Sequence, residues 1–220
     1  MWMFSQNLTL ERLLMHILAA LVIVFLVLPL HECAHGWVAG KLGDRTAEFS
    51  GRMTLNPLEH FDILGAVGLL IFGYGWAKPV PVDPSNFKKP RRDMALVALA
   101  GPVSNILAAI AGGLILNCLS AIVGVPVALK INMFVNTFVR LNVSLAVFNL
   151  IPLPALDGFR ILEGILSPKM LEKYYEKRHI IILITFVLLF IGVFNLPLNI
   201  LENFLFSFII RLINIPFLIF

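Results

Sequence analysis

Charged residues are scarce in this chain of 220 residues: Asp, Glu, Lys and Arg make up 14% of it, whereas 59% is hydrophobic. Soluble domains carry roughly 25% charged residues. So few charges cannot cover the surface of a soluble globule, and the mean hydropathy is +0.91. The scarcity excludes an ordinary cytosolic domain and a disordered chain, and it favours a multi-pass membrane protein.

Cysteine is also rare. The two cysteines, Cys33 and Cys118, both lie in apolar stretches, so the sequence does not suggest a disulfide framework. Basic stripes with interleaved aromatic residues are absent, so no nucleic-acid partner is expected. No small-residue cleavage site follows the first apolar run, which is therefore interpreted as a retained span and not as a signal peptide.

The apolar runs predict an all-α polytopic membrane protein with a single domain over residues 1–220. A helical span needs about 20 apolar residues, so this length accommodates about four to six. Full spans are expected at residues 13–38, 94–119, 131–151 and 180–196, whereas residues 200–220 could span the membrane or lie at its interface. Residues 63–76 are too short to span and rich in glycine, which indicates a re-entrant or interfacial element.

The basic residues orient the chain. Of the 17 Lys and Arg residues, 13 fall in the segments 36–62, 77–93 and 153–179. Cytoplasmic loops carry the excess of Lys and Arg, so these segments are expected in the cytosol and the N-terminus outside. This predicts a multi-pass protein of the plasma (cell inner) membrane, with basic residues 88–92 meeting anionic lipid headgroups of the bilayer.

The string His31-Glu32-Cys33-Ala34-His35 carries the chemistry. Residues four apart share one helix face, so both imidazoles can reach one metal ion, and imidazole suits Zn²⁺. Glu32 lies beside them and could take a proton from a water molecule at the metal and pass it to the leaving amine. The alternative is a helix that has just left the membrane and carries ordinary interfacial polar residues.

A catalytic zinc needs a third ligand, for which Asp157 is the best candidate. It is the only acidic residue between Asp93 and Glu163, a stretch dominated by two predicted spans. The nearby residues Pro152 and Pro154 break the helix and could aim this carboxylate into the bundle. The alternative is that Asp157 only caps the helix that follows it.

Three asparagines and one histidine have more open roles. Asn105 follows Gly101 in a seam of small residues and could hydrogen-bond a substrate carbonyl or oxyanion, although a packing role is equally possible. Asn142 and Asn149 are seven residues apart and share a helix face that leads toward Asp157. His60 has a structural or a site-lining role.

Together these motifs resemble the site-2 protease family of intramembrane zinc metalloproteases. The resemblance rests on the HExxH string, on Gly101-Pro102-x-x-Asn105 and on Asn149-x-x-Pro152-x-Pro154-x-x-Asp157-Gly158. No segment is long enough for a PDZ or CBS domain, so the chain is similar to the compact subgroup. The resemblance implies that His31, His35 and Asp157 bind one Zn²⁺ and that Glu32 is the catalytic residue.

The resemblance also implies a substrate. It predicts hydrolysis of peptide bonds within or next to the transmembrane segment of a membrane protein, in regulated intramembrane proteolysis with the active site toward the cytosol. Residues 48–55 and 75–82 are the candidates for β-segments that pair with an extended substrate, and Asn105 and Asn149 match polar positions of the family. A zinc transporter or a catalytically silent partner-binding homologue is the alternative, but residues 180–196 contain no acidic residue or histidine for transport.

Overall fold

The computed structural model describes residues 9–72, 77–154 and 156–215, and all regular secondary structure within them is helical. Four helices are long and apolar enough to cross a membrane: Leu10–Leu42, α6 (Pro90–Ala121), α7 (Val125–Asn149) and α11 (Asn195–Asn214). The prediction of an all-α polytopic membrane protein is therefore confirmed.

The first long helix changes its winding just before the HExxH string. It consists of α1 (Leu10–Val22), the π-helical turn η2 (Ile23–Val27) and α2 (Leu28–Leu42), and Leu28 N–H bonds the carbonyl of Ile23 five residues back. Pro29 has no N–H to continue the regular ladder, and single π-turns within α-helices are frequent at functional sites. The extra residue of the turn sets which face of α2 meets the rest of the bundle.

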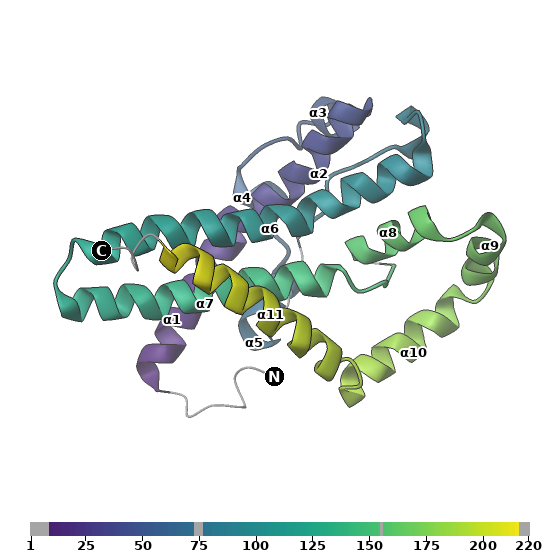
Figure 1. Cartoon of the computed structure of the whole chain (residues 1–220). Helices are drawn as coiled ribbons and strands as arrows, with labels where there is room; N and C mark the ends of the chain where they lie inside the picture. The colour runs from purple at the N-terminus through teal and green to yellow at the C-terminus, as the bar shows by residue number, and fades with distance from the viewer. Residues whose placement is uncertain (1–8, 73–76, 155, 216–220) are drawn as a thin grey trace.

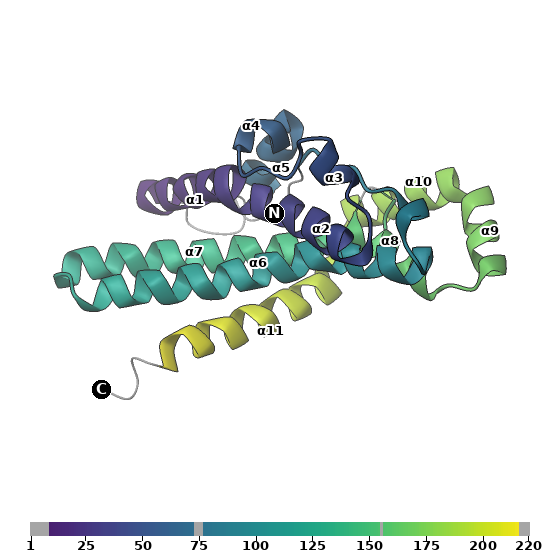
Figure 2. The same ribbon diagram turned by 90° about the horizontal axis from the view of Figure 1, so that it is seen from above.

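The long helices form three layers. Figures 1 and 2 show α6 and α7 running antiparallel as the middle layer, with α1 and α2 on one face and α11 on the other. Each interface is an apolar cluster. On one face of α7, Ile23 of the first helix and Leu145 of α7 belong to one apolar cluster. On the opposite face of α7, Val139 of α7 and Ile209 of α11 belong to a second cluster.

Short helices connect α2 to α6: α3 (Thr46–Phe49), α4 (Pro57–His60), α5 (Ile63–Phe72) and the 3₁₀ turn η3 (Pro84–Asn86). In the element predicted at residues 63–76, the described part is α5, whose ten residues reach about 15 Å, less than the thickness of a membrane. The predicted β-segments are wrong wherever the structure describes them. Residues 48–55 continue from α3 into irregular chain, and residues 77–82 have no regular structure; residues 73–76 lie outside the described part.

Three shorter helices follow α7: α8 (Asp157–Ile165), α9 (Pro168–Glu176) and α10 (Arg178–Ile191). The prediction of a full span over residues 180–196 is wrong, because α10 has 14 residues and reaches only about 21 Å. The chain turns at Gly192, whose φ of 84° is in the left-handed region that favours glycine. The next helix, α11, has the length of a span, which favours the spanning alternative for this region.

Candidate metal centre

Three side chains from two helices converge in the structure. His31 and His35 lie one turn apart on α2, and Asp157 is the first residue of α8. The two Nε2 atoms are 3.1 Å apart. Oδ2 of Asp157 lies 3.3 Å from His31 Nε2, and Oδ1 lies 3.3 Å from His35 Nε2. The structure thus brings together the three residues that the sequence nominated as ligands.

The other ring nitrogen of each histidine is held by α6. His35 Nδ1 donates to the backbone carbonyl of Val97 at 2.7 Å, and His31 Nδ1 donates to Oδ1 of Asn105 at 3.3 Å. A carbonyl oxygen only accepts, so Nδ1 carries the proton in both rings. Both Nε2 atoms then present lone pairs, which is the tautomer that binds a metal.

This donor set fits a zinc ion. In this tautomer two nitrogen lone pairs and a carboxylate face one another, and Asp157 Oδ2 is buried without a hydrogen-bond partner among the described residues. A metal cation placed between them would satisfy all three. At Zn–N and Zn–O distances of about 2.0–2.1 Å, neighbouring ligand atoms of a tetrahedron are about 3.3 Å apart. The two nitrogens are 3.1 Å apart, and each has a different oxygen of Asp157 at 3.3 Å, so the two imidazoles and the carboxylate are close enough to share one ion. Three protein ligands leave a fourth position open, as in catalytic zinc sites.

Gly101 of α6 leaves the space that this ion needs. A Cβ atom at Gly101 would overlap Nε2 of both His31 and His35. The sequence suggested only helix packing for this glycine, but its closest neighbours are the two imidazoles. Any side chain here would intrude on the point where the ligand atoms meet.

Asp157 is held by an unusually close backbone approach. A Cβ at Gly158 would collide with the carbonyl of Leu150, so only glycine lets α8 begin against the end of α7. The other end of α8 is held by Arg91, whose Nη2 donates to the Glu163 carbonyl at 2.8 Å. The N-cap of α8 is Leu156, so the alternative that Asp157 serves as a helix cap is not observed.

Glu32 is buried beside the histidines and does not point away from them. It offers a carboxylate oxygen within 4.8 Å of the ring nitrogens of His31 and His35. Its Oε2 atom accepts a hydrogen bond of 2.9 Å from the backbone N–H of Val80, in the irregular chain before α6. One carboxylate oxygen is therefore fixed by the protein.

The remaining candidates differ in how they are bonded. Asn105 is fully buried, and its Nδ2 atom has no partner within the described ranges. Asn142 and Asn149 each donate to a carbonyl one turn earlier in α7, those of Phe138 and Leu145. The amide of Asn105 is thus the one of the three whose nitrogen is left unused.

His60 and Cys33 have structural contacts. His60 is buried and its Nε2 donates to the Thr54 carbonyl at 2.8 Å, which favours the structural alternative. Cys33 donates from Sγ to the same carbonyl and thus faces the connecting segment, away from the ligand atoms. The one-sided placement of the histidines on α2 agrees with the helical spacing.

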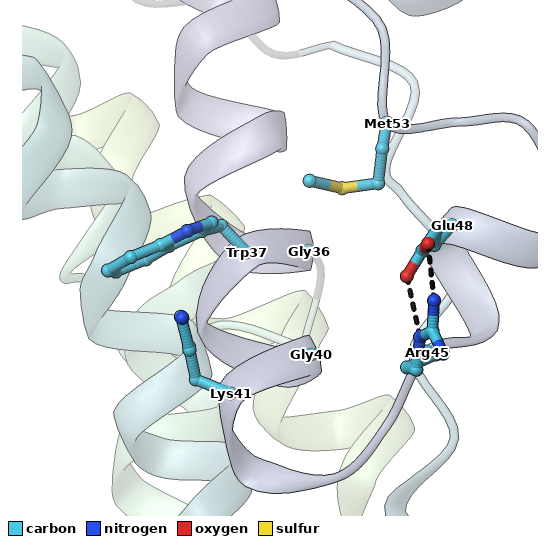
Figure 3. Close-up of a pocket in the computed structure, with 7 residues that line it drawn as sticks. All are labelled: Gly36, Trp37, Gly40, Lys41, Arg45, Glu48 and Met53. Atoms are coloured by element: carbon cyan, nitrogen blue, oxygen red, sulfur yellow. Dashed lines mark hydrogen bonds and ion pairs between the residues drawn. The ribbon is translucent and has the colours of Figure 1, made fainter.

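A separate cavity of about 340 Å³ lies between the last turns of α2 and the segment around α3 (Figure 3). In it, Arg45 pairs with Glu48 and Met53 lies against Gly36. The complete lining is Gly36, Trp37, Gly40, Lys41, Arg45, Glu48 and Met53. It shares no residue with the ligand set, so it is distinct from the metal centre.

Sequence reasoning missed the backbone partners of the site. The carbonyl of Val97 and the N–H of Val80 carry no signal in the identity of their side chains, because every non-proline residue has both groups. The contact of Asn105 with His31 was also missed, although its position in a seam of small residues on an apolar helix could have indicated a partner on the facing helix.

Comparisons with known proteins agree with this site. The family model described as Peptidase family M50 matches residues 116–193. "Putative zinc metalloprotease YwhC" of Bacillus subtilis is 41% identical over 175 residues, which cover 76% of this chain and 80% of the relative. "Putative zinc metalloprotease Rip2" of Mycolicibacterium smegmatis is 30% identical over 147 residues, which cover 64% of this chain and 55% of the relative. No solved structure matches the chain.

The first of these relatives extends over most of both chains, and the matched family region includes the position of Asp157. The apolar helices, the zinc-compatible donor set and these similarities lead to one conclusion: the chain belongs to peptidase family M50, the site-2 protease family, and is a zinc metalloprotease of the membrane.

Proposed function

We propose that this metalloprotease cleaves its substrates inside the membrane, within or next to their transmembrane segments, as in regulated intramembrane proteolysis. The strongest support is the distance of the zinc-binding residues from the ends of the membrane helices that carry them. His31 lies 11 residues before the end of α2 at Leu42, and Gly101 lies 11 residues after the start of α6 at Pro90. Along both helices this is about 17 Å from the end that leads into the basic connecting segment.

We assign the metal to His31, His35 and Asp157, one zinc per chain. Each imidazole Nε2 lies 3.3 Å from an oxygen of Asp157, and Val97 and Asn105 hold the imidazoles in the binding tautomer. When bound, zinc polarises the scissile carbonyl and makes water a nucleophile at neutral pH. Buried carboxylates and histidines at membrane depth are costly unless they serve such a centre.

Glu32 is the proton carrier in this proposal. Its Oε2 is held by the Val80 N–H, so the other oxygen is left to accept a proton from water and return it to the leaving amine. Retention of the proton near the scissile bond requires a fixed carboxylate, because general acid–base catalysis depends on hydrogen-bond distance. The short contact to a backbone group supplies that fixation.

Asn105 orients His31 and also has a free donor. Its Oδ1 accepts from His31, and its buried Nδ2 has no partner in the part of the chain that the structure describes. We propose that Nδ2 donates to the substrate carbonyl, whose oxygen becomes negative as the bond is attacked. Asn149 would join it only by releasing its bond to Leu145.

The substrate must be unwound at the scissile bond, because a helix keeps its peptide groups in its own hydrogen bonds. The basic segments 36–62 and 77–93 adjoin the ends of α2 and α6 nearest the metal centre. By the positive-inside rule, this supports cleavage toward the cytosolic side, which we assign to the plasma membrane.

The test uses a panel of quenched fluorescent single-span peptides, rich in Leu and Ala and interrupted at different depths by Gly and Asn, in proteoliposomes with purified enzyme. Mass spectrometry locates each cut. The proposal expects cleavage inside or beside the apolar segment of the interrupted peptides, and none by Glu32→Gln. Cleavage confined to soluble control peptides, or equal cleavage by Glu32→Gln, would contradict it.

A further inference from the structure

We propose that Arg52 is a positioning residue for Glu32: it fixes the carbonyls of Lys78 and Pro79 and, through them, the Val80 amide that holds the catalytic carboxylate. This inference rests on the proposed function of Glu32 as proton carrier. Arg52 lies in the irregular chain between α3 and α4, 20 residues along the sequence from Glu32.

The backbone of residues 78–80 is bonded almost entirely to the rest of this segment. Nη2 of Arg52 donates to the carbonyl of Lys78 at 3.0 Å and to that of Pro79 at 3.2 Å. The N–H of Lys78 donates to the carbonyl of His60 at 2.8 Å. Pro79 has no N–H, so the N–H of Val80 is the next donor along the chain, and it is the one that reaches Glu32.

These bonds form a chain of contacts from Arg52 to the catalytic carboxylate. No side chain of residues 78–80 takes part, since all the groups that receive or give a hydrogen bond belong to the backbone. An irregular segment has no ladder of its own to define its position. The Arg52 guanidinium therefore donates the two hydrogen bonds to backbone carbonyls that a neighbouring strand would donate in a sheet.

The same bonds bear on how substrate is held. The sequence resemblance predicted that residues 75–82 present an edge strand to the substrate. In the structure, the N–H of Lys78, both carbonyls at Lys78 and Pro79, and the N–H of Val80 already have partners within the protein. Because these backbone groups already bond to Arg52, His60 and Glu32, they are not free to pair with a substrate strand. This favours a positioning role for residues 78–80 over strand pairing.

Positioning of this kind acts on the rate of the chemical step. A displacement of about 1 Å in a catalytic group can cost about 100-fold in rate even when the change is made away from the reacting atoms. Loss of the Arg52 contacts should therefore lower kcat by about 10-fold to 100-fold, while zinc content and KM for the peptide stay at their wild-type values. Arg52 bonds the backbone of Lys78 and Pro79 and is not one of the assigned zinc ligands.

The experiment compares Arg52→Ala and Arg52→Lys with Arg45→Ala in the full-length zinc-loaded protein. Arg45 lies on the same connecting segment but pairs with Glu48 and lies over the ring of Phe49. For each variant, kcat and KM are measured on the best-cleaved peptide of the panel, zinc is quantified, and hydrogen exchange is followed at the amides of Lys78 and Val80.

Arg52→Ala is expected to lose kcat alone and to exchange faster at Lys78 and Val80. Arg52→Lys is expected to lie between it and wild type, because an ammonium can donate to the same carbonyls but sits on a flexible stem and is not pre-organised as the guanidinium is. A kcat equal to that of Arg45→Ala, a rise in KM alone, or a loss in proportion to zinc content would overturn the inference. If Glu32→Gln is inactive in the same assay, such a result leaves the proposed function intact; an active Glu32→Gln would refute that function instead.

Discussion

His31 and Asp157 are 126 positions apart in the sequence, yet Nε2 of one lies 3.3 Å from Oδ2 of the other. This contact joins the first membrane helix to the short helix after the third, and α6 lies against both. The metal centre thus lies where three helices far apart in the sequence pack together. Its ligands also make the side-chain contacts between α2 and α8.

The first prediction concerns Asp157. Asp157→Ala removes one of three donors, so the purified protein should lose stoichiometric zinc and all peptide cleavage. Glu59→Gln, a change at an exposed carboxylate of α4, serves as the control and should keep both. Zinc is measured by mass spectrometry after dialysis. Full zinc content in Asp157→Ala would remove this residue from the ligand set.

The second prediction concerns Gly101. A methyl group there overlaps Nε2 of His31 and of His35, so Gly101→Ala should abolish zinc binding while the protein still folds. The matched control is Gly40→Ala on α2, where an added Cβ meets no atom within 4 Å. That change should be neutral or should stabilise the helix by about 0.5–1 kcal/mol. Normal zinc affinity in Gly101→Ala would contradict the position assigned to the ion.

The third prediction concerns the partner of His31. Asn105→Ala removes the acceptor that holds the His31 tautomer, and such outer partners typically contribute about 10-fold to 100-fold in metal affinity. We expect zinc affinity to fall by this factor in a competition titration with a chelator. Asn136→Ala, which changes an exposed asparagine of α7 bonded within its own helix, should leave affinity unchanged; equal affinities for the two variants would argue against the orienting role.

Much of this site was visible in the sequence because its chemistry depends on side chains with strong preferences. The spacing of His31 and His35 predicts one helix face, and an isolated Asp157 in apolar surroundings indicates a buried role. The turn at η2 and the failure of residues 180–196 to span were not predictable from apolar content. They depend on where Pro29 and Gly192 interrupt regular winding, and composition averages over such positions.

The backbone contacts could not be foreseen for another reason. Val80 N–H and Val97 C=O reach the site because segments distant in the sequence pack together, and their side chains are ordinary apolar ones. The strand prediction failed at residues 78–80 because those peptide groups bond to Arg52, His60 and Glu32. A family resemblance can indicate an extended chain, but it does not say which partner takes the hydrogen bonds of that chain.

The fourth prediction concerns pH and Asp44, which follows the end of α2. Burial raises the pKa of this carboxyl, but hydrogen bonds from Thr46, Asn86 and the Asp83 N–H outweigh it and lower the pKa below its usual value. A lowered folded-state pKa stabilises the fold above the unfolded pKa of about 3.9 and loses this contribution as pH falls through the folded value.

Asp44→Ala should therefore destabilise the detergent-solubilised protein at pH 7 by about 2–3 kcal/mol, because it removes hydrogen bonds to a charged group. The difference from wild type in denaturant unfolding should stay constant from pH 7 to about 5 and shrink below about pH 4. Glu59→Ala, at an exposed carboxylate of α4, provides the reference. A difference that grows on acidification would contradict the assignment.

The most direct test of the account measures zinc content and single-turnover cleavage on the same preparations of wild type and Glu32→Gln. The substitution keeps the shape of the side chain and its bond to Val80 but removes its ability to accept a proton. The account predicts one zinc per chain in both proteins and a cleavage rate about 100-fold to 10,000-fold lower in Glu32→Gln. Equal rates in the two zinc-loaded proteins would contradict it.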